Sequence, residues 1–250
     1  MSAAVRVERA ARVIVDCVIP ALNEATSIGR VLELLPRPLV RRAVVSDNGS
    51  VDGTADVARA HGALVVSEPE RGYGAACLRG IAALELDPPD VVLFLDGDLS
   101  DDPSEAEQLV EPIRSGRADL VIGSRTRGVR EPGALTPQAR FGNWLATRLI
   151  RSLYGVRYTD LGPFRAIRWD SLRRLGMRDR AFGWTVEMQV KAARRGVRAE
   201  EVPVRYRRRI GRSKISGTVS GSVRAGVAIL GVIAGEAFQG SRLEPPVSTL

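Results

Sequence analysis

Short apolar runs, rich in β-branched residues, alternate with helical patterns through the first half of the chain. The apolar runs predict buried strands at 13–19, 43–46, 63–67, 91–95 and 120–123. Apolar residues at helical spacing predict helices over 28–35, 54–60, 75–86 and 103–115, and Pro36 ends the first of these. Strands that alternate with helices through short connections are typical of a parallel sheet with helices on both faces.

The pattern becomes less regular in the second half. We expect a loop over 127–137, a long helix with an arginine-rich polar face over 138–154, and a loop with a short strand over 159–167. A helix over 182–195, a strand over 201–206 and a weakly amphipathic helix over 219–237 follow. The tail from Gly240 contains two prolines and is expected to be disordered.

Polar residues follow four of the predicted strands. These are Asn23 and Glu24, Asp47 and Asn48, Asp96 and Asp98, and Ser124 and Arg125. Parallel sheets of this type bind ligands in a crevice outside the carboxyl ends of their strands. The sequence therefore predicts one crevice at which all four strand ends converge.

The tripeptide Asp96-Gly97-Asp98 comes directly after a buried apolar run. Two carboxylates on a tight turn offer hard oxygen ligands to Mg²⁺ or Mn²⁺, and such an ion would keep open positions for phosphate oxygens. Many ordinary turns also contain this tripeptide, so it is the position directly after a buried strand that favours a metal site over a plain turn. We predict that Asp96 and Asp98 bind a divalent metal ion.

Two further turns resemble parts of a nucleotide site. Asp47 ends a strand and could accept hydrogen bonds from a base or ribose, whereas Asp52 fits a helix cap as well as a ligand. The segment Arg71-Gly72-Tyr73-Gly74 precedes a helix, where glycines let the backbone approach a phosphate and arginine adds charge. A plain turn is the alternative interpretation of this short segment.

Composition narrows the class of protein. The chain has 250 residues, of which 44% are hydrophobic, so it can build one sizeable α/β core. One histidine and two cysteines exclude a disulfide framework, a Cys/His metal cluster and a Ser-His-Asp triad, and reduced cysteines suit a cytoplasmic protein. No secretory signal or apolar stretch of about 20 residues is present, so no membrane span is expected.

The net charge of +8 is concentrated in the run 205–214. Such a run suits a nucleotide diphosphate, anionic lipid headgroups at a membrane periphery, or nucleic acid. Few aromatic residues accompany the run and no nucleic-acid-binding motif is present, so nucleic acid is the weakest of these partners. The helix predicted at 219–237 could either lie on a bilayer or pack on the domain, and packing is favoured slightly.

Taken together, the motifs resemble family 2 glycosyltransferases, in particular the branch of dolichol-phosphate mannose synthase and bacterial polyprenyl-phosphate glycosyltransferases. The segments that carry the resemblance are, in order, VIPALNE, DNGSVDGT, RGYGAACLRG, DGDLSDDP, GSR and EVPVRYRRRIGRSK. The resemblance covers about residues 13–215 and implies a GT-A fold. That fold has a nucleotide half at about 13–124 and an acceptor half at about 125–215. Residues 1–12 are then a flexible N-terminus, and 216–250 a C-terminal helix and tail.

The resemblance also implies an activity and roles for residues. It implies inverting transfer from a nucleoside-diphosphate sugar, UDP-glucose or GDP-mannose, to a polyprenyl or dolichyl phosphate. The implied donor-binding residues are Pro20, Glu24, Asp47, Arg71, Gly72, Asp96, Arg209, Ser213 and Lys214, with Asp96 and Asp98 at the metal. Arg125 and Arg140 fall where such enzymes bind the acceptor phosphate, and Asp160 matches an acidic residue near the reacting centre. Related enzymes often self-associate, so a homo-oligomer is compatible with this reading.

The sequence departs from the family pattern at two positions. Asn48 stands where an aspartate is usual, and Ser100 stands where a glutamine is usual, so the coordination of the metal could differ. The C-terminal membrane helices of many relatives have no counterpart here, which suits a soluble hydroxyl acceptor as an alternative.

The nature of the acceptor decides whether a base is needed. A phosphate is already an anion and needs none, but a hydroxyl does. Asp160 is then the first candidate base and Glu187 the second. The structural alternatives are a loop cap for Asp160, packing for Glu187 and a solvated helix face for Arg140. A third function, of another class, is a non-catalytic module that binds sugar nucleotide or membrane.

Overall fold

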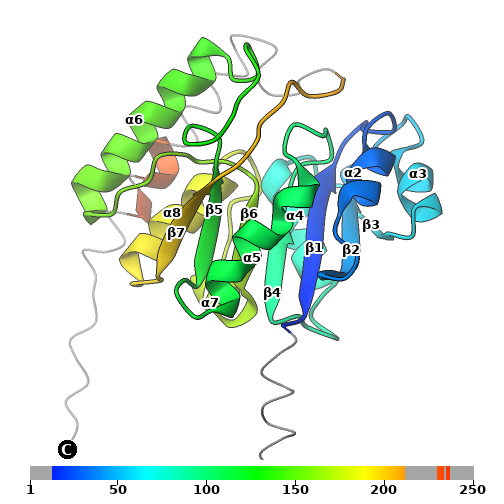
Figure 1. The fold of residues 1–250 in the computed structure, drawn as a ribbon, viewed down its shortest axis with the longest axis horizontal. Coiled ribbons are helices and arrows are strands. Elements are labelled where there is room, and N and C mark those ends of the chain that lie inside the picture. Colours follow the sequence, from blue (N-terminus) through cyan, green and yellow to red (C-terminus); the bar gives the residue numbers. More distant parts are fainter. Residues whose placement is uncertain (1–12, 212–229, 234, 237–250) are drawn as a thin grey trace, which may run out of the picture.

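Residues 13–211, 230–233 and 235–236 are described by the computed structural model of the chain (Figure 1). The predicted flexible N-terminus at 1–12, Ser213 and Lys214 lie outside these residues, as does most of the predicted helix at 219–237. Within the described residues, no helix is long and apolar enough to span a bilayer.

The described strands form one sheet, with the order β3-β2-β1-β4-β6-β5-β7. Their bounds are β1 (Val15–Ala21), β2 (Val40–Asp47), β3 (Leu64–Ser67), β4 (Val91–Phe94), β5 (Leu120–Ser124), β6 (Arg165–Arg168) and β7 (Ala199–Pro203). All pairings are parallel except those of β6, which runs antiparallel to both β4 and β5. The prediction of a mostly parallel sheet is confirmed.

The reversed direction of β6 has a consequence for the site. Arg165 at its start pairs with Phe94, at the carboxyl end of β4, and Arg168 pairs with Val91 at the other end. The chain therefore enters β6 from the carboxyl edge of the parallel strands. The loop before β6, which contains Asp160, is thereby held at the edge where the polar strand ends lie.

Helices cover both faces of the sheet, as expected. On one face, α2 (Ile28–Leu34), α3 (Thr54–Ala60) and α5 (Ala106–Arg114) share a core with one set of alternate strand residues. On the other face, α4 (Tyr73–Ala82), α6 (Pro137–Tyr154), α7 (Trp169–Leu175) and α8 (Trp184–Arg194) pack on the remaining set. A short 3-10 turn, η1 (Pro103–Glu105), precedes α5. In β1, Cys17 and Ile19 face the first core and Val18 the second, because successive strand residues point to opposite faces.

Several elements differ from the prediction. Pro20 does not end the first strand, since β1 continues to Ala21. The pairing of β1 with β4 ends at Val18, so Pro20 has a strand partner on one side, and its missing N–H costs no ladder bond on the other. Helix α7 was not predicted, and β7 lies at 199–203 instead of 201–206. Residues 204–206 leave the sheet and cross its carboxyl edge, where the Tyr206 N–H donates to the Val129 carbonyl.

Candidate active site

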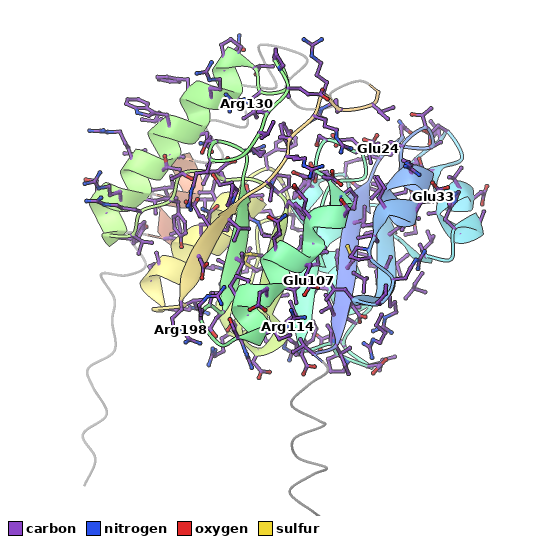
Figure 2. The ribbon with its side chains drawn as sticks, viewed as in Figure 1. Glu24, Glu33, Glu107, Arg114, Arg130 and Arg198 are labelled. Carbon is purple, nitrogen blue, oxygen red and sulfur yellow. The ribbon has the colours of Figure 1, made fainter. Side chains whose placement is uncertain are left out.

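A cleft of about 280 Å³ opens at the carboxyl edge of the sheet, and we call it the main cleft. It is lined by Pro20, Ala21, Leu22, Glu24, Asn48, Arg71, Gly72, Tyr73, Ala76, Asp96, Gly97, Asp98, Ala181, Phe182 and Arg209. Glu24 and Arg130 are labelled at this edge in Figure 2. The residues that follow β1, β2 and β4 thus converge as predicted, whereas Ser124 and Arg125 do not line the main cleft.

Asp96 and Asp98 are each held by a different residue of the main cleft. The Tyr73 hydroxyl, from the start of α4, donates to Asp96 Oδ1 at 3.0 Å. Asp98 is nearly buried, and its Oδ2 lies 3.1 Å from Arg209 Nη1. The backbone N–H of Ser100 donates to Asp98 Oδ1 at 2.9 Å. Both carboxylates are therefore oriented before any ligand binds.

The carboxylates fit a divalent cation that is completed by oxygens from a substrate. No group of three or more His, Cys, Asp or Glu side chains suitable for a metal occurs within the described residues. Mg²⁺ commonly uses one or two protein carboxylates together with substrate phosphates, so a pair is sufficient. Burial and then the charge of Asp98 raise the pKa of Asp96 to about 7. A cation at this pair would relieve the repulsion between the two charges.

Without a divalent ion, we expect the charge on Asp96 to destabilise the fold as the pH rises. Its folded pKa of about 7 lies above the unfolded value of 3.8, so the folded state binds the proton more tightly. The penalty is absent below about pH 4 and grows up to about pH 7. Asp96→Asn should therefore raise the free energy of unfolding by about 1–2 kcal/mol at pH 8, discounted for partial exposure, and by less at pH 5. Urea denaturation in EDTA measures this, and an equal effect at both pH values would contradict it.

Asn48 explains one departure from the family pattern. Its side-chain amide donates to the carbonyls of Glu68 at 3.0 Å and Glu70 at 2.6 Å, and its Oδ1 accepts from the Gly72 N–H at 2.8 Å. A carboxylate has no N–H to donate to the two carbonyls. Asn48 therefore holds the 68–72 turn in place.

Asp47, the neighbouring residue predicted at the donor, lies outside the lining of the main cleft. Its carboxylate accepts a hydrogen bond from the Ser50 N–H.

The turn itself brings Arg71 and Gly72 into the main cleft. Arg71 donates to the Gly49 carbonyl at 3.0 Å, which links this turn to the loop after β2. A Cβ on Gly72 would lie 2.0 Å from the Arg180 carbonyl oxygen, so any other residue would push the two segments apart. Glycine at position 72 therefore lets this turn pack directly against the backbone of Arg180 at the edge of the main cleft.

A second cavity, of about 350 Å³, lies beside the main cleft, and we call it the arginine pocket. It is lined by Arg125, Gly133, Ala134, Leu135, Thr136, Ala139, Tyr206, Arg208, Arg209 and Gly211. Arg209 lines both cavities. Thr136 caps the start of α6, whose free N–H groups favour anions. Arg208 was not predicted as a site residue, because nothing in the run 205–214 distinguishes it from its neighbours.

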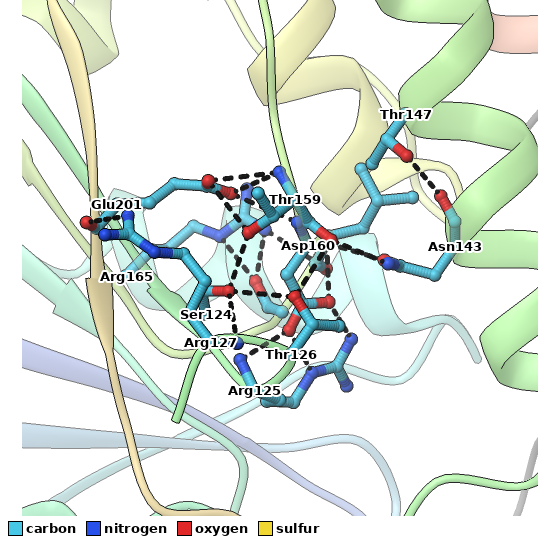
Figure 3. A network of polar contacts seen from close by, with 12 residues as sticks. Ser124, Arg125, Thr126, Arg127, Asn143, Thr147, Thr159, Asp160, Arg165 and Glu201 are labelled. Atoms are coloured by element: carbon cyan, nitrogen blue, oxygen red, sulfur yellow. Dashed lines mark hydrogen bonds and ion pairs between the residues drawn. The ribbon is translucent and has the colours of Figure 1, made fainter. Parts of the chain in front are cut away.

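Arg125 and Asp160 form a buried ion pair beside the arginine pocket (Figure 3). Arg125 Nε lies 2.8 Å from Asp160 Oδ2, and Arg125 Nη2 lies 2.6 Å from Oδ1. The N–H groups of Arg125 and Leu161 also donate to this carboxylate. Burial by itself lowers the pKa of Arg125. The charge of Asp160 and its hydrogen bonds to the guanidinium together have the larger effect, so the pKa of Arg125 is raised. The carboxylate is fully buried and accepts four hydrogen bonds, so it orients Arg125 in this structure.

The remaining predicted residues lie apart from the two cavities. The Glu187 carboxylate accepts from the N–H groups of Arg178 and Asp179 and pairs with Lys191 at 2.6 Å. It lies outside both linings, so the structure does not bring the second candidate base into either cavity. Arg140 is exposed on the first turn of α6, next to Ala139 of the arginine pocket.

Two buried polar residues escaped the sequence analysis. Arg165 is fully buried, donates to the carbonyls of Gly162 and Thr185, and has its pKa lowered to about 10 by burial. Asp101 is fully buried with both carboxylate oxygens unpaired among the described residues. Burial and then the charge of Asp96 raise the pKa of Asp101. Neither residue could be distinguished by sequence, because only the folded chain decides that they are buried.

Comparison with known proteins places this geometry in a family. The model of glycosyl transferase family 2 matches residues 16–176, which is more than half of the chain. A glycosyltransferase of Mycobacterium tuberculosis is 38% identical over 214 residues, covering 84% of this chain and 94% of the relative. The undecaprenyl-phosphate mannosyltransferase of Micrococcus luteus is 32% identical over 236 residues, covering 87% and 93%. The dolichyl-phosphate hexose transferase of Haloferax volcanii is 33% identical over 203 residues, covering 80% and 86%.

Solved structures agree in fold. Glucosyl-3-phosphoglycerate synthase from Mycobacterium tuberculosis, in complex with Mn²⁺ and UDP-glucose, superposes with a TM-score of 0.68 at 26% identity. The match covers 94% of this chain and 84% of that structure. The sheet order, the helices on both faces and these neighbours are those of a GT-A fold. This chain therefore belongs to glycosyl transferase family 2 and is a glycosyltransferase with a GT-A fold.

Proposed function

We propose that this glycosyltransferase moves a hexose, with inversion, from a nucleoside-diphosphate sugar to the phosphate of a polyprenyl or dolichyl phosphate. The observation that carries the proposal is the pair of adjoining cavities that share Arg209. One cavity contains the carboxylate pair, and the other is lined by arginines. Two relatives whose names specify undecaprenyl phosphate and dolichyl phosphate support this class of acceptor.

The donor, UDP-glucose or GDP-mannose, belongs in the main cleft. Pro20 and Glu24, which line this cleft, and Asp47, which ends β2 next to the lining residue Asn48, are the candidates for the nucleoside. Arg71 and Gly72 are the candidates for the diphosphate. Asp96 and Asp98 would hold Mg²⁺ or Mn²⁺, which neutralises the charge that develops on the departing diphosphate. Arg209, now paired with Asp98, is placed to contact the diphosphate from the side of the arginine pocket.

The acceptor phosphate belongs in the arginine pocket, where Arg125 and Arg208 offer charge-assisted hydrogen bonds. A phosphate oxygen attacks the anomeric carbon from the face opposite the diphosphate. A new C–O bond forms, the bond to the diphosphate breaks, and its electron pair leaves with the diphosphate. Because the acceptor is already an anion, no residue needs to remove a proton, and Asp160 serves to position Arg125.

A hydroxyl acceptor is the alternative within the same enzyme class. It requires a base, and Asp160 would then have to release Arg125, its bidentate partner. A non-catalytic sugar-nucleotide or membrane-binding module is the alternative of another class. The Asp96 and Asp98 pair, together with membership of a family of glycosyltransferases, argues against that module.

A ligand panel tests the proposal. We expect one nucleoside-diphosphate sugar, among UDP-glucose, GDP-mannose, UDP-N-acetylglucosamine and dTDP sugars, to raise the melting temperature in the presence of Mn²⁺ but not in EDTA. At 100 times the Kd, the ligand stabilises the fold by about 2.7 kcal/mol. The same donor should then glycosylate a short-chain polyprenyl phosphate but not the matching polyprenol. No shift with any donor would contradict the donor site, and transfer to the polyprenol alone would contradict the phosphate acceptor.

A further inference from the structure

Helix α6 has an unusual distribution of charge for a surface helix. Residues 137–154 include three arginines, Arg140, Arg148 and Arg151, and no aspartate or glutamate. All three arginines are exposed, and none has an acidic partner within the described part of the chain. The inner face of the helix is anchored, because Ala146 and Ile150 are buried in the core beneath it. The helix therefore presents a fixed and uncompensated positive face.

Two aromatic rings share that exposed face. The exposed fractions are 62% for Phe141 and 52% for Trp144, and their ring centroids are 5.8 Å apart. The Arg148 guanidinium carbon lies 5.7 Å from the centroid of the Trp144 ring. Positions 141, 144, 148 and 151 recur at helical spacing, so they form one stripe along the helix. Helix α6 lies at the outer edge of the fold in Figure 1, and side chains project outward from it in Figure 2.

We infer that this stripe, formed by Arg140, Phe141, Trp144, Arg148 and Arg151, docks on the surface of an anionic phospholipid bilayer. Exposed aromatic rings cost free energy in water but suit the headgroup layer, where their apolar faces leave water. Arginines interleaved with the rings are complementary to anionic headgroups. A basic helix face with Trp and Phe is the pattern of a helix that lies in the membrane interface.

The position of α6 links this surface to the chemistry. Its first turn contributes Ala139 to the arginine pocket, and its N-cap residue Thr136 lines the same pocket. Ala139 lies about 140° around the helix from Trp144 at about 100° per residue, so a bilayer held against the stripe lies about one helix diameter, about 10 Å, from the pocket. An acceptor with its phosphate among the headgroups could then reach Arg125 without leaving the membrane. In this respect alone the inference rests on the proposed function, since it assigns the acceptor to a lipid.

The test is binding of the full chain to vesicles, without donor or acceptor, measured by flotation. We expect binding to vesicles that contain phosphatidylglycerol and little binding to phosphatidylcholine alone. Binding should weaken between about 0.1 M and about 1 M salt, because screening shortens from about 10 Å to about 3 Å. The double variant Phe141→Ser/Trp144→Ser should lower the partition coefficient at least about tenfold, and Arg148→Glu/Arg151→Glu should do the same.

Matched controls separate the stripe from general effects. Leu153 is 53% exposed on the same helix, but lies about 180° around it from Trp144 at about 100° per residue. Leu153→Ser should leave vesicle binding unchanged. Arg59→Glu reverses an exposed arginine on α3, at the other end of the sheet, and should have much less effect than a reversal on α6.

Each outcome decides the inference independently of catalysis. If the unaltered chain does not bind anionic vesicles, the inference is overturned even if transfer to a short-chain polyprenyl phosphate is active. If Phe141→Ser/Trp144→Ser leaves vesicle binding intact but converts a dimer to a monomer in sedimentation, the stripe faces a second copy instead. If Phe141→Ser/Trp144→Ser loses the vesicle binding of the unaltered chain while the donor still raises its melting temperature, the docking surface is supported and the donor site is intact in this variant.

Discussion

Replacing Asp98 with asparagine should lower the rate of glycosyl transfer by at least about a thousandfold, equivalent to about 4 kcal/mol of transition-state stabilisation. In the proposed reaction, the charge on the departing diphosphate is neutralised at Asp96 and Asp98. Asparagine keeps the shape of the side chain but removes the negative charge that holds a divalent ion. Initial rates at saturating donor and Mn²⁺ measure this loss.

The same substitution should change the free energy of unfolding by less than about 1 kcal/mol. The asparagine oxygen can still accept from the Ser100 N–H, which lies 2.9 Å from Asp98 Oδ1. The lost ion pair with Arg209 is offset by reduced repulsion with Asp96. The matched control is Asp119→Asn, which removes a carboxylate paired with Arg198 before β5. Activity within about tenfold of the unaltered enzyme would overturn the metal assignment, since loss of a metal ligand costs several kcal/mol.

Replacing Arg125 with alanine should affect both stability and the acceptor. The change leaves the fully buried Asp160 carboxylate without its bidentate partner, which should lower the free energy of unfolding by about 3–5 kcal/mol. In the double variant Arg125→Ala/Asp160→Asn, no unpaired charge is buried, so we expect at least half of that loss to be recovered. Urea denaturation of the two single variants and the double variant completes the cycle.

Catalysis should not recover in the double variant. Arg125 lines the arginine pocket, so its loss should raise the KM for the acceptor phosphate at least about a hundredfold and leave the KM for the donor unchanged. Arg198→Ala is the control for stability, because the Arg198 side chain is 57% exposed and its ion pair with Asp119 is worth about 1 kcal/mol or less. An unchanged acceptor KM in the double variant would remove Arg125 from the acceptor site. Recovery of transfer without Arg125 would argue against the arginine pocket as a whole.

Much of the main cleft could be predicted from sequence, because its signals are local. The apolar run before Asp96 predicts a buried strand, and the end of such a strand in a parallel sheet is a ligand-binding edge. The same reasoning applies to Glu24, which follows β1 and lines the main cleft with Asp96 and Asp98. Pattern and strand position suffice here, since each residue lies within a few positions of its own strand.

The sequence was less informative about residues whose hydrogen-bond partners lie in a distant segment of the chain. Asp47 is the residue expected at the donor, and the structure shows its neighbour Asn48 in the lining of the main cleft, where it holds a turn 20 to 24 residues away. Glu187 was a candidate base by residue type and position, yet it anchors the N–H groups of residues 178 and 179. Nothing in a single sequence shows which backbone groups a side chain will meet after folding.

The sequence by itself determined the alternation of strands and helices, the strand-end carboxylates and the basic run, because periodicity and turn chemistry act between near neighbours. The tertiary structure decided the rest. The antiparallel direction of β6 returns Asp160 to the carboxyl edge, 35 residues after Arg125, and burial makes the two an ion pair. The segment after β7 crosses the same edge and brings Arg209 between the two cavities. Such contacts depend on how distant segments pack, which local pattern does not encode.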